Sequence, residues 1–319
     1  MPDAHRPIAL YAGPEDRAAA WVGALEASAQ AADVPVRIIE EKDGVAPERV
    51  DYVLFGAWSQ PFDLSPYAGV KAILSLWAGV EKILERSDYP SGVPLARMVE
   101  PGLTGGMTDY VVAHVMRAHM DLDGVRDRHA ARRWDDVYPP LSSERTVGII
   151  GMGALGLDAA RALRALRFRV RGWSRSPKSE PSVESFAGYE RLDAFLSETE
   201  ILVLLAPLTA ETRGLMNGAR LAKLPAGAHI INAARGPLLP EADLLAALDD
   251  RLGSATLDVF DEEPLPDDHP YWSHPKVLVT PHIASVTRPE TAAPELIAQI
   301  ARAERGEPLL HLVDFDRGY

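Results

Sequence analysis

The sequence contains no cysteine, which excludes disulfide bonds and any metal or redox site built on thiolates. It has no apolar run near the ~20 residues that a membrane-spanning helix needs, so we expect no membrane partner. Its first residues do not join a basic segment to a long apolar stretch, and we expect no signal peptide and a cytoplasmic location. The net charge of −13 argues against binding to nucleic acids and to anionic membranes.

The length of 319 residues fits about two domains, each large enough for its own hydrophobic core. Short apolar segments typical of strands alternate with helical or turn segments, which predicts an α/β protein with parallel sheets. The strand candidates are 7–13, 34–40, 51–57, 71–77, 93–99, 146–150, 168–173, 201–209, 227–236, 254–260 and 276–282.

Two helical segments set the expected domain boundaries. A break at residues 101–103 precedes a helical pattern from 104 to about 133, which joins the first unit to the second. A last helix is expected over 287–305, folded back onto the first unit. We therefore predict a substrate-binding domain of residues 1–100 plus 287–319 and a dinucleotide-binding domain of residues 101–286.

A glycine-rich turn at residues 151–156 is the clearest cofactor signal in the chain. A β-branched apolar strand precedes it and an amphipathic helical pattern follows, which is the context that a G-x-G-x-x-G dinucleotide site requires. Gly151 permits the tight turn, Gly153 lets a pyrophosphate approach the backbone, and Gly156 lets the helix pack on the strand. The alternative is a tight strand-to-helix turn without a ligand. The predicted phosphate-binding residues are Gly151, Gly153, Ala154, Leu155 and Gly156.

Acidic residues are absent between Ala159 and Ser179, whereas basic residues are frequent there. For Arg161, Arg164 and Arg167 we favour a solvated helix face over a binding role. The stretch still offers local positive charge to an anionic dinucleotide in an otherwise acidic chain.

Arg175 lies 19 positions after Gly156, where NAD-binding members of this fold carry an acidic residue for the ribose 2′-hydroxyl. The nearest acid, Glu180, comes later. A guanidinium can bond a 2′-phosphate with two parallel hydrogen bonds, so we predict NADPH over NADH. Arg175 is the predicted discriminating residue, and its alternative role is that of an exposed surface residue. The assisting residues are Ser174, Ser176 and Lys178.

Arg235, Glu263 and His282 follow three predicted strands of the second domain. Ligands bind outside the carboxyl ends of strands in open parallel sheets, so all three lie where chemistry is expected. Taken singly, each has an ordinary structural explanation: a solvated arginine, a loop acid and a structural histidine.

Four motifs together resemble the D-isomer-specific 2-hydroxyacid dehydrogenase family: GMGALG, NAARG, LDVFDEEPLP and TPHIAS, in this order and at matching spacing. The resemblance extends over essentially the whole chain. It implies two Rossmann-like domains with doubly wound parallel sheets and a cleft between them. GWSRSPKS, SFAGYERLDAFLS, DLLAALD and the TRP after His282 resemble the branch of glyoxylate/hydroxypyruvate reductases A.

The resemblance implies an NADPH-dependent reduction of a small 2-oxo acid to the 2-hydroxy acid, without a metal. Protonated His282 would donate a proton to the carbonyl oxygen, and Glu263 would hold its ring and stabilise the imidazolium. Arg235 would bind the carboxylate and carbonyl oxygen of the substrate. Glyoxylate or hydroxypyruvate is the favoured substrate, while pyruvate and phenylpyruvate stay open.

Further site residues are implied by the same resemblance. WAGVEKI (77–83) is similar to the family's substrate loop, in which backbone amides, here those around Ala78, Gly79 and Val80, hold the carboxylate. Asp258 would help to fix the nicotinamide carboxamide. The residues expected along the cofactor path are Met107, Thr108, Pro207, Ala233 and Ser285.

Trp58, Trp77 and Arg288 are weaker substrate-binding candidates. A large apolar wall at either tryptophan would favour small substrates, and core packing is the alternative. Trp77 departs from the family motif, which often carries a small residue there. Arg288 offers a second anion contact or, alternatively, a surface residue at a helix start.

The expected partners are a small 2-oxo acid and a second copy of the chain. A homodimer is implied by the family, through the second domain and residues 104–143. A dinucleotide-sensing corepressor-like binding protein is the alternative from another functional class, because some relatives of this fold bind partner proteins.

Overall fold

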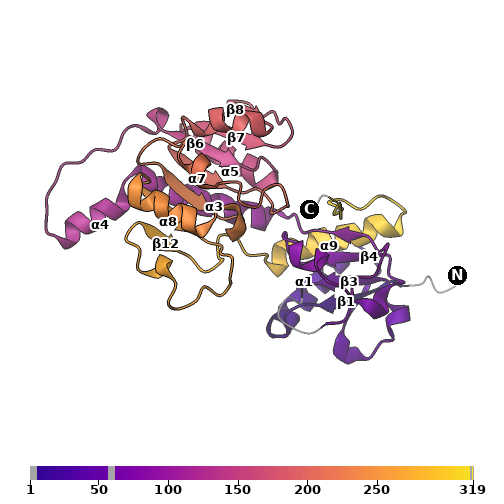
Figure 1. Ribbon diagram of the computed structural model, residues 1–319. Coiled ribbons are helices and arrows are strands. Elements are labelled where there is room, and N and C mark those ends of the chain that lie inside the picture. Colours follow the sequence, from indigo (N-terminus) through magenta and orange to yellow (C-terminus); the bar gives the residue numbers. More distant parts are fainter. Residues whose placement is uncertain (1–5, 57–61, 317, 319) are drawn as a thin grey trace. The chain divides into compact units, whose positions relative to one another are not determined.

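The computed structural model describes residues 6–56, 62–316 and 318, and it divides into two units (Figure 1). Unit 1 comprises Met1–Leu103 and Val286–Tyr319, and unit 2 comprises Thr104–Ser285. Each unit has a parallel β-sheet with helices, five strands in unit 1 and seven in unit 2 within the described residues. The predicted α/β class with doubly wound parallel sheets is confirmed.

The sheet of unit 1 has the strand order β2-β1-β3-β4-β5. Successive side chains alternate between two hydrophobic clusters: Tyr11 and Leu54 lie in one, whereas Leu10 and Val53 lie in the other. Both faces of the sheet are therefore covered, which explains why its strands are apolar throughout. The strands are β1 (Ile8–Ala12), β2 (Arg37–Glu40), β3 (Tyr52–Phe55), β4 (Ala72–Ser75) and β5 (Leu95–Ala96).

Helices α1 (Ala18–Ala31) and α9 (Pro289–Glu304) share one of these clusters. Trp21 of α1 and Ile300 of α9 are both fully buried in it. The expectation that the last helix folds back onto the first unit is thus confirmed. Among the residues that the structure describes, unit 1 also contains the short helix α2 (Glu81–Leu84).

The sheet of unit 2 has the order β12-β11-β10-β9-β6-β7-β8. Strand order reverses between β6 and β9, and this switch point is where open α/β sheets bind ligands. Edge strand β8 was not predicted; its weak pattern buries only Phe186 fully. The strands are β6 (Thr146–Ile150), β7 (Arg169–Ser174), β8 (Val183–Ala187), β9 (Ile201–Leu204), β10 (His229–Asn232), β11 (Ser254–Leu257) and β12 (Val277–Val279). The helices after β6 are α5 (Ala154–Ala165), α6 (Leu192–Leu196), α7 (Gly218–Leu221) and α8 (Glu241–Asp250).

The single helix expected over residues 104–133 is wrong in both its start and its continuity. Helix α3 (Pro101–His119) begins earlier, because proline suits a first helical turn and the Glu100 carboxylate accepts hydrogen bonds from the N–H groups of Gly102 and Leu103. A second helix, α4 (Leu122–Ala130), starts after a break at Asp121. Asp121 has a φ of 47°, and its side chain caps α4, a role that aspartate fills well.

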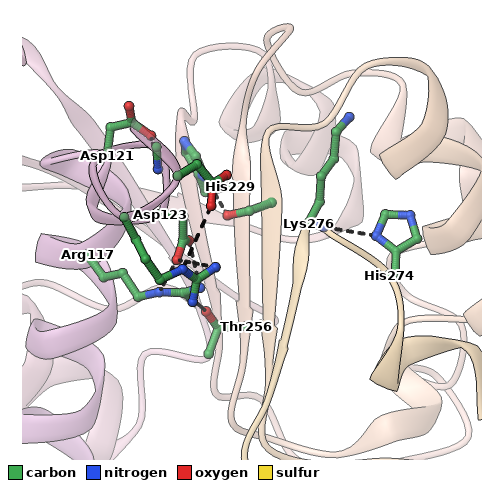
Figure 2. A network of polar contacts seen from close by, with 11 residues as sticks. Arg117, Asp121, Asp123, His229, Thr256, His274 and Lys276 are labelled. Atoms are coloured by element: carbon green, nitrogen blue, oxygen red, sulfur yellow. Dashed lines mark hydrogen bonds and ion pairs between the residues drawn. The ribbon is translucent and has the colours of Figure 1, made fainter. Parts of the chain in front are cut away.

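A polar network joins the end of α3 and the start of α4 to strands β10 and β11 (Figure 2). The Arg117 guanidinium lies 2.6 Å from the Asp123 carboxylate and donates a 3.0 Å hydrogen bond to Thr256 Oγ1. At the amino end of β10, His229 Nδ1 lies 2.8 Å from Ser254 Oγ. Burial lowers the pKa of His229, so the ring is neutral in this network. These contacts lie away from the carboxyl ends of the strands, where the candidate site is found.

Candidate active site

The glycine turn after β6 has the conformation that its sequence predicts. Gly151 has a φ of 107°, and a Cβ there would lie 2.5 Å from the backbone nitrogen of Ala206. A Cβ on Gly156 would lie 2.1 Å from the carbonyl oxygen of Gly151. Both positions therefore need glycine for reasons of turn geometry and close packing.

Gly153 differs from these two, because a Cβ built there would meet nothing within 4 Å. It is the N-cap of α5, and no side chain caps this helix and no acid lies in its first turn. Backbone N–H groups and the positive end of the helix dipole thus face open space. This arrangement fits the pyrophosphate of a dinucleotide.

Arg175 follows β7 and forms an exposed ion pair, with its Nη1 3.3 Å from Oε2 of Glu211. Ser174 Oγ donates to the carbonyl of Ser176 at 2.7 Å, which shapes the same turn. Glu180 is engaged by Arg161 through two hydrogen bonds, of 3.0 and 2.8 Å. The nearest acid after Arg175 is therefore already neutralised by an arginine of α5.

His282 and Glu263 form a close pair in unit 2, with His282 Nδ1 2.7 Å from Glu263 Oε2. The second carboxylate oxygen accepts a 2.9 Å hydrogen bond from the N–H of Phe260, which fixes the carboxylate plane. Because a carboxylate only accepts here, Nδ1 carries a proton and Nε2 is the nitrogen that can donate to a substrate. The His282 side chain is half exposed, at 50 %.

Opposing effects set the ionisation of Glu263. Burial favours its neutral form, but the hydrogen bonds from His282 and Phe260, with the charges of His282 and Arg235, outweigh burial and lower the pKa of Glu263 below its usual range. The carboxylate therefore stays ionised beside His282 at neutral pH.

Arg235 ends the segment after β10 and precedes a short turn at Gly236–Leu238. Its backbone is held by Asn232, whose Nδ2 donates a 3.1 Å hydrogen bond to the Arg235 carbonyl. A Cβ on Gly236 would lie 2.2 Å from the Phe260 carbonyl carbon, so the backbones after β10 and β11 are in contact. Since β10, β11 and β12 are neighbours in the sheet, Arg235, Glu263 and His282 all follow adjacent strands.

The residues expected along the cofactor path all lie in unit 2. Met107 and Ala233 share one hydrophobic cluster. The Pro207 carbonyl accepts a hydrogen bond from Thr212, and a Cβ on Gly106 would lie 2.9 Å from Ser285 Oγ. Thr108 Oγ1 donates a 2.6 Å hydrogen bond to Asp158 of α5.

Asp258 is buried and accepts three hydrogen bonds from the segment that carries His282. The donors are Thr280 Oγ1 at 2.6 Å and the N–H groups of Ile283 and Ala284, both at 2.9 Å. The Thr280 hydroxyl also contacts the Tyr110 hydroxyl at 2.8 Å. Neither hydroxyl is among the residues predicted from the sequence. Thr280 lies next to the segment of His282 in the sequence, whereas Tyr110 is 170 positions away from Thr280.

Unit 1 carries the remaining candidates for substrate binding. The Trp77 indole donates a 3.2 Å hydrogen bond to the Gly56 carbonyl and packs on the hydrophobic cluster that contains α1. Val80 is buried at the start of α2, and Arg288 is an exposed N-cap of α9. Trp58 lies outside the described residues.

Comparison with known proteins agrees with these observations. Residues 112–284 match the model of the D-isomer specific 2-hydroxyacid dehydrogenase, NAD binding domain. Glyoxylate/hydroxypyruvate reductase A from Yersinia enterocolitica is 43% identical over 84% of this chain and 88% of its own length. The protein of the same name from Salmonella newport is 40% identical over 97% of this chain and 99% of its own length.

Two crystal structures share the fold. A D-isomer specific 2-hydroxyacid dehydrogenase from Xanthobacter autotrophicus, in complex with NADPH and MES, has a TM-score of 0.91 and 42% identity, covering 98% of this chain and 100% of its own. An NADPH-dependent glyoxylate/hydroxypyruvate reductase from Sinorhizobium meliloti, in complex with NADP and sulfate, has a TM-score of 0.86 and 36% identity with the same coverage. The chain belongs to the D-isomer-specific 2-hydroxyacid dehydrogenase family.

Proposed function

We propose that this enzyme uses NADPH to reduce glyoxylate or hydroxypyruvate to the corresponding 2-hydroxy acid. The observation that carries the proposal is the 2.7 Å contact between His282 and Glu263. These residues follow β12 and β11, which are next to β10, the strand that precedes Arg235. The substrate choice is supported by the relatives at 40% and 43% identity, which are named glyoxylate/hydroxypyruvate reductase A.

The catalytic roles follow from the chemistry of the side chains. When bound, NADPH supplies the hydride that adds to the carbonyl carbon. His282, protonated on both ring nitrogens, donates its Nε2 proton to the carbonyl oxygen, so that the product is a hydroxyl and the ring becomes neutral. Glu263 accepts from Nδ1 and stabilises the imidazolium before the transfer. Water then returns a proton to Nε2.

Arg235 binds the substrate carboxylate in this proposal and polarises the carbonyl group, because a planar guanidinium matches two oxygen acceptors. For unit 1 we propose that the amides around Ala78, Gly79 and Val80 are substrate-binding groups. Trp58, Trp77 and Arg288 are proposed substrate-binding residues as well, although the Trp77 N–H already donates to Gly56.

A substrate screen tests the function. NADPH oxidation at 340 nm is followed with glyoxylate, hydroxypyruvate, pyruvate and phenylpyruvate, each at several concentrations. We expect the highest kcat/KM with glyoxylate or hydroxypyruvate. A higher value with pyruvate or phenylpyruvate would reassign the substrate, and turnover of none would favour a dinucleotide-sensing binding protein.

For the cofactor we propose that the pyrophosphate binds at the bare backbone of Gly153 and the 2′-phosphate at Arg175. The ion pair between Arg175 and Glu211 is exposed, and exposed pairs contribute about 0–1 kcal/mol. Exchange of the Glu211 carboxylate for a phosphate therefore costs little. Ser174, Ser176 and Lys178 assist in this proposal.

Arg175→Asp is expected to lower kcat/KM for NADPH by about 10–100-fold, because a charged hydrogen-bond partner of the phosphate is replaced by a repelling carboxylate. The value for NADH should stay the same or rise. Steady-state kinetics with both cofactors measures the change. Arg169→Asp is the matched control, since Arg169 is exposed at the opposite end of β7 and the charge change is equal. If the ratio of kcat/KM for NADPH to kcat/KM for NADH is unchanged in Arg175→Asp, the assignment of Arg175 is contradicted.

A homodimer is also proposed, through the segment that contains α4 and the residues after it. Figure 1 shows α4 extending away from the sheet of its unit. Large apolar side chains are exposed along this segment, among them Trp134 at 95 % and Tyr138 at 83 %. Exposed apolar groups in such a concentration are typical of protein interfaces, and a second copy of the chain is the occupant that we propose.

The double variant Trp134→Asp, Val137→Asp is expected to convert a dimer into a monomer, because two carboxylates would be buried in the interface. Light scattering coupled to size-exclusion chromatography gives the mass in solution. Asp136→Ala, in the same exposed stretch, should leave the mass unchanged. A wild-type chain that is already monomeric at micromolar concentration would refute the proposal.

A further inference from the structure

Three oxygen-bearing side chains form a hydrogen-bonded chain behind the His282 segment. The Tyr110 hydroxyl of α3 lies 2.8 Å from Thr280 Oγ1, and Thr280 Oγ1 lies 2.6 Å from Asp258 Oδ1. The three residues come from α3 and from the ends of β11 and β12, all within unit 2. The chain has no part in the catalytic roles given above for His282, Glu263 and Arg235.

The direction of each hydrogen bond in this chain is determined. The Asp258 carboxylate accepts from the N–H groups of Ile283 and Ala284, and its Oδ1 also accepts the single hydroxyl proton of Thr280. Thr280 can therefore only accept from Tyr110, so Tyr110 is the donor. Burial raises the pKa of Tyr110, which means that the phenol keeps this proton throughout the working pH range.

The geometry around His282 shows what the chain can hold in place. His282 has a φ of 52°, a conformation that residues other than glycine seldom adopt. Its N–H donates a 2.9 Å hydrogen bond to the Asp258 carbonyl, and the two following N–H groups bond to the Asp258 carboxylate. In the part of the chain that the structure describes, the half-exposed imidazole bonds to the side chain of Glu263, and its position also depends on this backbone turn.

We propose that Tyr110 and Thr280 are positioning residues for His282: the Tyr110 hydroxyl orients Thr280, Thr280 orients Asp258, and Asp258 fixes the turn that presents the imidazole. The inference rests on the proposed role of His282 as proton donor. Neither hydroxyl touches the reacting atoms. Their effect is on how often the imidazole is aligned with the substrate, and therefore on kcat rather than on cofactor affinity.

Four variants separate this role from ordinary packing. Tyr110→Phe removes only the hydroxyl, and the ring keeps its contact with His114, whose ring centroid lies 4.2 Å away. Thr280→Val removes the donor to Asp258 at nearly constant volume, and Thr280→Ser restores it. The fourth variant combines Tyr110→Phe with Thr280→Val.

We expect kcat to fall about 10–50-fold in Thr280→Val and about 3–5-fold in Tyr110→Phe, in line with the loss of a hydrogen bond to a charged group and to a neutral one. Thr280→Ser should stay within about twofold of the wild type. The double variant should equal Thr280→Val, since Tyr110 acts only through Thr280. In the variants that lose a hydroxyl, the KM for NADPH should change less than kcat, because the Asp258 carboxylate, which is expected to bind the nicotinamide carboxamide, is itself retained.

Single-turnover oxidation of NADPH measures these rates, and thermal unfolding confirms that each variant is folded. An unchanged rate in Thr280→Val, additive losses in the double variant, or a loss confined to the KM for NADPH would each overturn the inference. His282→Ala, measured in parallel, keeps the two questions apart. If it retains the wild-type rate, the proposed function fails; if it is inactive while the four variants behave as wild type, only the positioning role fails.

Discussion

His282→Ala is expected to lower kcat for reduction of the 2-oxo acid by about 10²–10⁴-fold, the usual contribution of a general acid. The variant removes the nitrogen that delivers the proton as the hydride arrives, so negative charge would accumulate on the carbonyl oxygen. The Kd for NADPH, measured by fluorescence titration, should be unchanged because the proposed phosphate contacts lie at Gly153 and Arg175.

Two further variants make the result specific. His129→Ala removes an exposed histidine of α4 and should retain kcat within about twofold. Glu263→Gln keeps the shape of the pair but removes the charge that stabilises the imidazolium, and we expect a loss of about 10–100-fold. A His282→Ala enzyme with a wild-type rate would falsify the mechanism.

The lowered pKa of Glu263 adds a pH criterion to this prediction. A carboxyl group with a lowered pKa stays ionised as the pH falls, so Glu263 takes up its proton only below the usual range of a glutamate. The pH dependence of kcat above that range should therefore come from groups other than Glu263. One result would contradict an ionised Glu263: the kcat of the wild type falls on acidification near the usual pKa of glutamate, and the kcat of Glu263→Gln does not fall there.

Arg235→Gln should reduce kcat/KM for the 2-oxo acid by about 10²–10⁴-fold, with most of the effect in KM. Two charge-assisted hydrogen bonds to a carboxylate are lost, and each contributes about 1.5–3 kcal/mol. The amide of glutamine is shorter and uncharged, so it can neither reach nor attract the substrate in the same way. Steady-state kinetics over a wide range of oxo-acid concentration separates KM from kcat.

Arg235→Lys is the matched variant, because it keeps the charge but loses the planar fork that binds two oxygens. We expect its kcat/KM for the 2-oxo acid to lie between those of the wild type and Arg235→Gln, about tenfold above that of Arg235→Gln. Equal activity of all three enzymes would show that Arg235 does not bind substrate. The charge of Arg235 also lowers the pKa of Glu263. In Arg235→Gln, the loss of kcat on acidification should therefore begin at a higher pH than in the wild type.

Local patterns were sufficient for much of the fold. The buried parallel strands are apolar throughout, and the glycine turn at residues 151–156 is recognisable from its spacing. The structure gives the reasons for two of its glycines: a positive φ at Gly151, and a Cβ on Gly156 that would lie 2.1 Å from the Gly151 carbonyl oxygen. The break at Asp121 and edge strand β8 were missed. A single capping aspartate and a strand with one fully buried side chain give little periodic signal.

In the candidate site, too, some features could be predicted from the sequence and others depend on the tertiary structure. Its three principal residues could be named because each follows a predicted strand within a motif, and parallel strands align their carboxyl ends by necessity. The pairing of His282 with Glu263 at 2.7 Å, and the accepting carboxylate of Asp258 behind it, depend on the order of β10, β11 and β12 in the sheet.

The sequence by itself determined the α/β class, the dinucleotide turn and the acid-free stretch around Arg175, since these depend on neighbouring residues along the chain. Only the tertiary structure decided that Tyr110 meets Thr280, 170 positions away, and that Arg161 neutralises Glu180. Contacts of this kind arise from packing of α3 against strand ends and of α5 beside the β7 loop. Packing is set by the whole core of unit 2, and no local pattern records it.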